Sequence, residues 1–121
     1  MGLDYVEIVL RTEDFFAITI GDEEAGALRT VGDFYNLICA KLNITPLEAP
    51  VISPQLPIVT KEERTLLLLY KRTPLPPPLE ILPWSPQSVW DSLVAIVADQ
   101  QGLDPKEAHI RARFAEDLGV N

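Results

Sequence analysis

The first third of the chain has the hydrophobic periodicity of an amphipathic helix. Apolar residues recur at spacings of three and four, and the pattern continues towards Phe16. This spacing predicts a helix with one side against a core. The predicted core side consists of Leu3, Val6, Val9 and Leu10. The charged residues expected on the opposite side are Asp4, Glu7, Arg11 and Asp14.

Two further helices are predicted before residue 42. Asp22 suits the N-cap of a short helix over Glu23 to Leu28, which has acidic residues in its first turn. Thr30 suits the N-cap of the next helix. The apolar face of that helix would consist of Val31, Phe34, Leu37 and Ile38.

The last third opens with another helix signal. Ser85 suits the N-cap and Pro86 the first helical position, whereas Gly102 suits the left-handed residue that ends a helix. The sequence DPKEA, from Asp104, predicts a turn or a short helical piece. The apolar face of the long helix would consist of Val89, Leu93, Ile96 and Val97.

The middle third is rich in proline, which cannot continue a helix. Ten of the eleven prolines lie between Pro46 and Pro86, and we interpret these stretches as a surface linker. Thr60 and Glu63 have capping-box spacing, which favours a helix there. A strand through residues 66–69 is the alternative, because four consecutive leucines have no clear period.

Composition and charge narrow the classes of function. The chain has 121 residues, 47% of them apolar, and a net charge of −8. This length can bury a core in one domain. The acidic balance argues against binding to nucleic acids and to anionic membranes, since both need clustered Lys and Arg. We find neither a signal-like segment nor the roughly 20 apolar residues of a membrane span, and therefore predict a cytoplasmic protein.

Several motifs of the first third occur in a familiar order. Leu-Asp-x-Val-Glu begins at Leu3, an acidic helix ends at Phe16, DEEA begins at Asp22, and Thr-Val-Gly-Asp begins at Thr30. This order resembles the second half of an acyl carrier protein. In that family a first helix and a long loop, ending in F-x-x-D-L-G, come before these motifs. Here the matching stretch lies at the other end of the chain and includes residues 114–119.

The chain therefore resembles a circularly permuted acyl carrier protein. Residues 1–42 would hold the second to fourth helices, residues 43–85 a Pro-rich connector, and residues 86–121 the first helix and its loop. The resemblance implies an all-α four-helix bundle. The connector is long enough to close the bundle within a monomer, or to donate the last helix to a second chain in a domain-swapped dimer.

The resemblance also implies where a phosphopantetheine arm would be attached. In the family a serine stands immediately before Leu-Asp, but here Gly2 occupies that position. Glycine has no hydroxyl group, so we expect neither 4'-phosphopantetheine nor another cofactor. An arm on a serine elsewhere is the alternative. Those serines are Ser53, Ser85, Ser88 and Ser92.

The remaining candidate chemistry points to binding rather than catalysis. His109 is the only histidine, Cys39 lies in an apolar run typical of a core, and no Cys/His set has metal spacing. We therefore predict a protein that is not an enzyme and has no metal site.

The acidic side of the first helix is the predicted partner-binding site, because this helix docks onto basic patches of enzymes in the resembling family. The predicted binding residues are Asp4, Glu7, Leu10, Glu13 and Asp14. The resulting hypothesis is an acyl-carrier-like binding module near fatty-acid or polyketide biosynthesis. Its alternatives are a functional carrier and a structural protein unrelated to acyl transfer.

Overall fold

The described part of the chain is helical. The computed structural model describes residues 3–59 and 76–121. Its helices are α1 (Leu3–Phe16), α2 (Asp22–Ala27), α3 (Val31–Lys41) and α4 (Pro86–Gln101), with 3₁₀ turns η2 (Leu79–Ile81) and η3 (Pro105–Glu107). No strand and no helix long and apolar enough to cross a membrane occur in these two ranges. The all-α prediction is thus confirmed for them, whereas the helix or strand predicted between residues 60 and 69 lies outside them.

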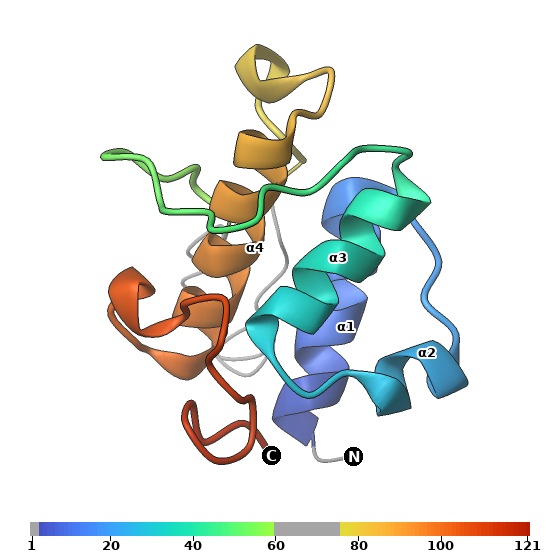
Figure 1. The fold of residues 1–121 in the computed structure, drawn as a ribbon, viewed down its shortest axis with the longest axis vertical. Helices are drawn as coiled ribbons and strands as arrows, with labels where there is room; N and C mark the ends of the chain where they lie inside the picture. The colour runs from blue at the N-terminus through green and yellow to red at the C-terminus, as the bar shows by residue number, and fades with distance from the viewer. Residues whose placement is uncertain (1–2, 60–75) are drawn as a thin grey trace, which may run out of the picture.

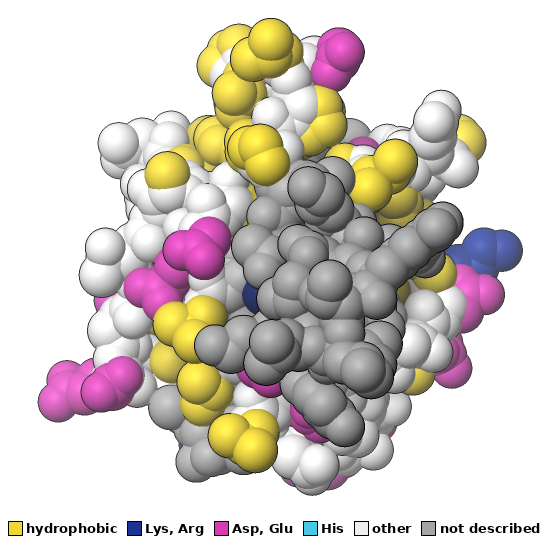
Figure 2. Space-filling model, turned by 180° about the vertical axis from the view of Figure 1, so that it is seen from behind, with side chains coloured by type: hydrophobic (Ala, Val, Ile, Leu, Met, Phe, Trp, Pro, Cys, Tyr) yellow, Lys and Arg dark blue, Asp and Glu magenta, His cyan; other side chains and the backbone are white. Residues whose placement is uncertain are grey.

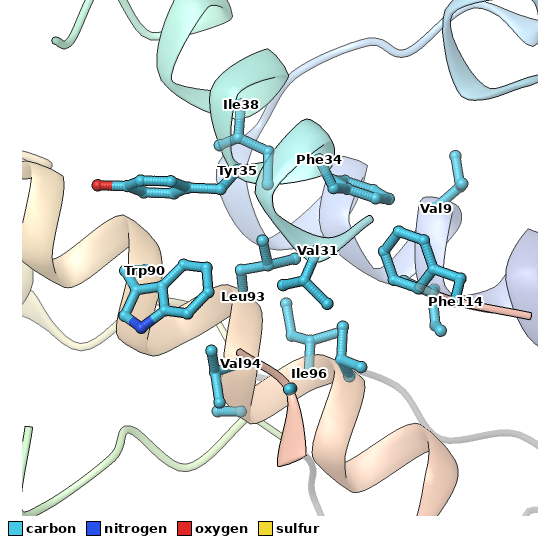
Figure 3. Packing of buried hydrophobic residues seen from close by; sticks show 14 of the residues in the cluster. Val9, Val31, Phe34, Tyr35, Ile38, Trp90, Leu93, Val94, Ile96 and Phe114 are labelled. Atoms are coloured by element: carbon cyan, nitrogen blue, oxygen red, sulfur yellow. The ribbon is translucent and has the colours of Figure 1, made fainter. Parts of the chain in front are cut away.

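The core lies between α1, α3 and α4, which pack together although α4 is last in the chain (Figure 1). Each of the three helices contributes large, fully buried side chains, for example Phe15, Tyr35 and Trp90. Figure 3 shows how residues of α3 and α4 interlock around Val31 and Leu93. Burial of one such side chain stabilises the fold by about 1.5–3 kcal/mol, so this three-helix contact dominates the stability.

Local capping signals set the helix ends largely as predicted. The Thr30 hydroxyl accepts a hydrogen bond from the Asp33 N–H at 3.0 Å, and Ser85 caps α4 ahead of Pro86 in the same way. Gly102 ends α4 in the left-handed region, with φ of 64°. Asp22 is not an N-cap as predicted but the first residue of α2. Gly21 is the N-cap, and its N–H is satisfied by the Glu24 carboxylate at 3.0 Å.

The predicted orientation of α1 is wrong. Leu3, Val6 and Leu10 are 82%, 36% and 54% exposed, and of the predicted core side only Val9 is buried. Helix α1 carries two apolar stripes, and the stripe that includes its aromatic residues faces the core because it buries more area. The residues of this buried stripe are Tyr5, Ile8, Val9, Thr12, Phe15 and Phe16.

Arg11, which the periodicity placed in solvent, is only 4% exposed. Its guanidinium donates to Asp99 Oδ2 at 2.8 Å and to Gln100 Oε1 at 2.9 Å. Gln100 Nε2 in turn donates to Glu7 Oε2 at 2.5 Å. A charge this deep needs charged or polar partners, and here α4 supplies them. The cluster therefore fixes α1 against the end of α4.

The first half of the connector is docked onto the helices. The Tyr35 hydroxyl donates to the Pro86 carbonyl at 2.8 Å and accepts from the Leu47 N–H at 3.0 Å. The Asp91 carboxylate accepts from the N–H and the hydroxyl of Ser53, at 2.9 and 2.6 Å. The interpretation as a plain surface linker is therefore too simple, because hydrogen bonds hold the connector to α3 and α4 at Leu47 and Ser53.

The C-terminal loop caps the start of α3. The Gly32 N–H donates to the Ile110 carbonyl and the Val31 N–H to the Ala112 carbonyl, both at 2.9 Å. Phe114 N–H donates back to the Arg29 carbonyl at 3.0 Å. The first N–H groups of a helix have no partner inside the helix, so this loop provides the acceptors that α3 lacks.

Candidate partner-binding surface

The outer side of α1 combines apolar and acidic residues. Leu3, Val6 and Leu10 follow one another at spacings of three and four, which places them on one side of the helix. By the same spacing Glu7 and Asp14 flank this row on one edge and Glu13 on the other. The face seen in Figure 2 shows hydrophobic side chains with acidic ones close by. An apolar centre with charged edges is the usual anatomy of a protein interface.

The five predicted binding residues differ in exposure. Leu10 and Asp14 are exposed, whereas Asp4, Glu7 and Glu13 are half-buried. Glu7 accepts from Gln100, and Glu13 Oε2 accepts from the Ile20 N–H at 2.9 Å. These two carboxylates therefore also hold α1 to α4 and fix the turn that follows α1. The role of all five residues in binding a partner protein stays a prediction.

Sequence reasoning missed Leu3 and Val6 as surface residues. They had been assigned to the core because they continue the periodicity of Val9 and Leu10. The second apolar stripe, which starts at Tyr5 and ends at two phenylalanines, is the signal in the sequence that could have distinguished the core side of α1 from its exposed side. With Leu3 and Val6 included, the exposed row spans two turns of α1.

The C-terminal loop lies against the start of α1. The Tyr5 N–H donates to the Asn121 carbonyl at 2.8 Å, and Phe114, Leu118 and Val120 are buried. The position predicted for the attachment serine, Gly2, lies outside the described residues. The start of α1 and the end of the C-terminal loop thus meet at one end of the bundle (Figure 1).

A hollow of about 300 Å³ lies between this loop, α1 and α2. Its lining includes Tyr5, Arg29 and Phe114. The Tyr5 hydroxyl donates to the Ala25 carbonyl at 2.6 Å, and burial raises the pKa of Tyr5 to about 12. The phenol is therefore protonated at neutral pH and serves as a donor that ties α1 to α2.

The loop is stabilised internally by one bidentate ion pair. Arg113 Nε and Nη2 each donate to the Asp117 carboxylate at 3.0 Å, and the Arg113 N–H donates to it at 2.9 Å. The side-chain bonds from Arg113, followed by the backbone bond, lower the pKa of Asp117 from 3.8 to about 2. The ionised form of Asp117 therefore stabilises the folded loop.

Replacement of Asp117 by Asn should remove an acid-sensitive part of the stability. Because the folded-state pKa is lowered, the contribution is present above about pH 4 and is lost as the pH falls towards 2. The melting temperature of the wild type should exceed that of Asp117→Asn near neutral pH, and the two should converge near pH 2. Circular dichroism melts across this range test the expectation. A difference that does not vary with pH would contradict it, and Glu116→Gln is the matched control.

The outer side of α1 thus combines an apolar row, acidic edges and a support from α4. The Arg11 cluster fixes α1 against α4, and the Asn121 carbonyl accepts a hydrogen bond from the first turn of α1. No family model matches the chain, and no solved structure matches it significantly.

Proposed function

We propose that this protein is a circularly permuted, acyl-carrier-like binding module without a phosphopantetheine arm. In this proposal it is a cytoplasmic protein and not an enzyme, and it docks through α1 onto a basic patch of an enzyme of fatty-acid or polyketide biosynthesis. The observation that carries the proposal is the exposed row of Leu3, Val6 and Leu10 bordered by carboxylates. Acidic edges accelerate encounter with a basic partner, and an apolar centre provides area to bury.

The hydrogen bond between Tyr5 and Asn121 supports the permuted register. If Asn121 were followed directly by Gly2, as the resemblance implies, Asn121 would stand four residues before Tyr5. A bond from an N–H to the carbonyl four residues earlier is the repeating bond of an α-helix. The Asn121 carbonyl therefore accepts the hydrogen bond that, in an unpermuted chain, the residue four positions before Tyr5 would accept within the same helix.

The contacts of the connector support closure within one chain. Residues 47 and 53 bond to Tyr35 and Asp91 of the same molecule. In a dimer that exchanges α4, the bond between Leu47 and Tyr35 would stay within one chain, and only the contact between Ser53 and Asp91 would have to form between two chains. We therefore propose a monomer, with the swapped dimer as the alternative that the mass in solution would identify.

Intact mass spectrometry after incubation with coenzyme A and a broad-specificity phosphopantetheinyl transferase tests the proposal. The wild type should gain no mass, because Gly2 has no side-chain hydroxyl group to accept the phosphopantetheine group of coenzyme A. Gly2→Ser should gain the mass of one arm, because the transferase would recognise the carrier-like surface of α1. An ordinary carrier protein treated in parallel shows that the enzyme is active.

Charge reversal then tests whether the acidic edge is used. Gly2→Ser combined with Asp14→Lys should be modified much more slowly than Gly2→Ser alone. Glu48→Lys, which makes the same charge change at an exposed position of the connector, is the matched control and should have little effect. A gain of mass by the wild type that disappears with one Ser→Ala change would establish the functional carrier instead. No modification of any variant would contradict a carrier-like surface.

A further inference from the structure

The proline stretch at the end of the connector forms an exposed tip. Residues 76–78 are three consecutive prolines, and they lead directly into η2. Figure 1 shows η2 projecting from the top of the molecule, beyond the start of α4. Leu79 is 84% exposed and Leu82 is 40% exposed, and Pro76 and Pro83 are exposed as well. Several exposed apolar side chains on one projecting segment mark a candidate interaction site.

Consecutive prolines fix the backbone of this tip in one conformation. The ring of each proline locks its φ at about −65°. Pro76 and Pro77 are each followed by another proline, which restricts them to extended ψ values. Pro78 has φ of −58° and ψ of 143°, which are values of polyproline II. Residues 76–78 therefore form one turn of a polyproline II helix before any partner binds.

The three-residue period of polyproline II decides which side chains face outwards. Pro76 and Leu79 are three positions apart, so they lie on the same edge, and both are exposed. Pro77 and Pro78 are half-buried, and Pro78 lines a hollow together with Leu56 of the connector. The edge of Pro78 thus faces the body of the protein, whereas the edge of Pro76 and Leu79 faces away from it.

The base of the tip is held by the helical core. Trp84 stands just behind the tip, and its ring packs against Phe16 of α1 with a centroid distance of 4.6 Å. The Ile81 N–H donates to the Pro78 carbonyl at 3.1 Å, so the chain turns back directly after the prolines. A segment whose conformation is fixed in advance loses little conformational entropy when it binds. The tip is therefore built as a preformed ligand.

The side chains of the tip indicate what kind of groove it fits. Between residues 76 and 83 the only charged residue is Glu80, which is exposed. Figure 2 shows the hydrophobic side chains at the top of the molecule with an acidic one beside them. Polyproline II segments dock into grooves lined by aromatic side chains, which pack against the proline rings. Lys or Arg at the rim of such a groove would complement Glu80.

We propose that residues 76–79 are a polyproline II ligand for an aromatic-lined groove of a partner protein, the kind of groove found in SH3, WW and EVH1 domains. Pro76 and Leu79 enter the groove, Pro77 packs against its wall, and Glu80 meets a basic rim. This inference does not rest on the proposed carrier function, because none of these residues belongs to α1.

Purified SH3, WW and EVH1 domains are the probes. Each ¹⁵N-labelled domain is titrated with the unlabelled full chain and followed in ¹H–¹⁵N correlation spectra. In at least one of the three domains, the signals of the aromatic groove should shift saturably. The domain that binds then serves for the comparison of variants.

Three substitutions in the tip test how it docks. Pro76→Ala and Leu79→Ala should each weaken binding at least about fivefold, since each removes apolar area that the groove buries. Glu80→Lys should weaken binding as well, because it places a cation at a basic rim. Pro54→Ala and Val51→Ala make the same two truncations at exposed positions elsewhere in the connector. These matched controls should leave binding unchanged.

The proposal is overturned if none of the three domains shows saturable shifts in its groove. It is also overturned if neither truncation in the tip weakens binding, or if the two controls weaken it to the same extent. Binding of Glu80→Lys that equals that of the wild type would contradict the basic rim. Melting curves of all variants show whether each remains folded.

Discussion

Gly32→Ala should lower the free energy of unfolding by about 3 kcal/mol. A β-carbon on Gly32 would lie 2.6 Å from both Cγ1 and the carbonyl oxygen of Ile110. The side-chain atom could move, but the carbonyl oxygen is held by its hydrogen bond from the Gly32 N–H, and the adjacent Val31 N–H is bonded to Ala112. The substitution therefore has to separate the C-terminal loop from α3.

Urea denaturation monitored by circular dichroism measures this loss. Gly26→Ala is a matched control, because a β-carbon there meets nothing within 4 Å and the residue lies inside α2. That change should stabilise the protein by about 0.5–1 kcal/mol, since alanine is the better helix former. Equal stability of Gly32→Ala and the wild type would mean that the loop does not approach α3 this closely in solution.

Asp99→Ala should have the second largest effect, a loss of about 2–3 kcal/mol. The change removes the 2.8 Å ion pair that the Arg11 guanidinium, which is 4% exposed, makes with Asp99. The reverse change, Arg11→Met, should cost only about 1 kcal/mol, because Asp99 is 26% exposed and can take up water, whereas methionine fits an apolar site.

The double variant Arg11→Met with Asp99→Ala distinguishes a buried-charge penalty from a loss of packing. It should be more stable than Asp99→Ala alone, because neither charge of the ion pair then remains in the interface between α1 and α4. Chemical denaturation of the four proteins completes the cycle. If Arg11→Met were the more harmful single change, the packing of the arginine stem would outweigh its charge.

The helices could be predicted from the sequence because their signals are local. Thr30, Ser85 and Gly102 each act within one turn, and all three lie at the predicted helix ends. The four residues predicted to face the core from α4 are all fully buried: Val89, Leu93, Ile96 and Val97. The prediction of one apolar face was too narrow, however, because every residue of α4 from Val89 to Ala98 is buried.

The orientation of α1 was not predictable in this way. Two apolar stripes satisfy the same periodicity, and the choice between them depends on which neighbours they meet. Arg11 illustrates the reason, because its partner Asp99 lies 88 positions away in the chain. The periodicity of the residues around Arg11 predicts that its side chain faces solvent. That short stretch of sequence contains no information about the partner of Arg11 in α4.

The sequence pointed to the acidic residues and Leu10 as binding residues, which stays a prediction, but it assigned Leu3 and Val6 to the core. Asp14 stands out by charge alone, whereas Leu3 and Val6 become surface residues only because Tyr5 and Ile8 take the core. The hollow between the C-terminal loop, α1 and α2 could not be predicted from the sequence, since it exists where three separate segments of the chain meet.

The position of α4 at the end of the fold has a consequence for synthesis on the ribosome. Phe34 and Tyr35 of α3 are fully buried, with Trp90 packed against Tyr35 and Phe114 against Phe34. Gln101, the last residue of α4, is translated 60 residues after Lys41, the last residue of α3. At roughly 5–20 residues per second this interval lasts roughly 3–12 s. During that time the nascent chain exposes aromatic side chains of its core, which is the kind of surface that chaperones bind.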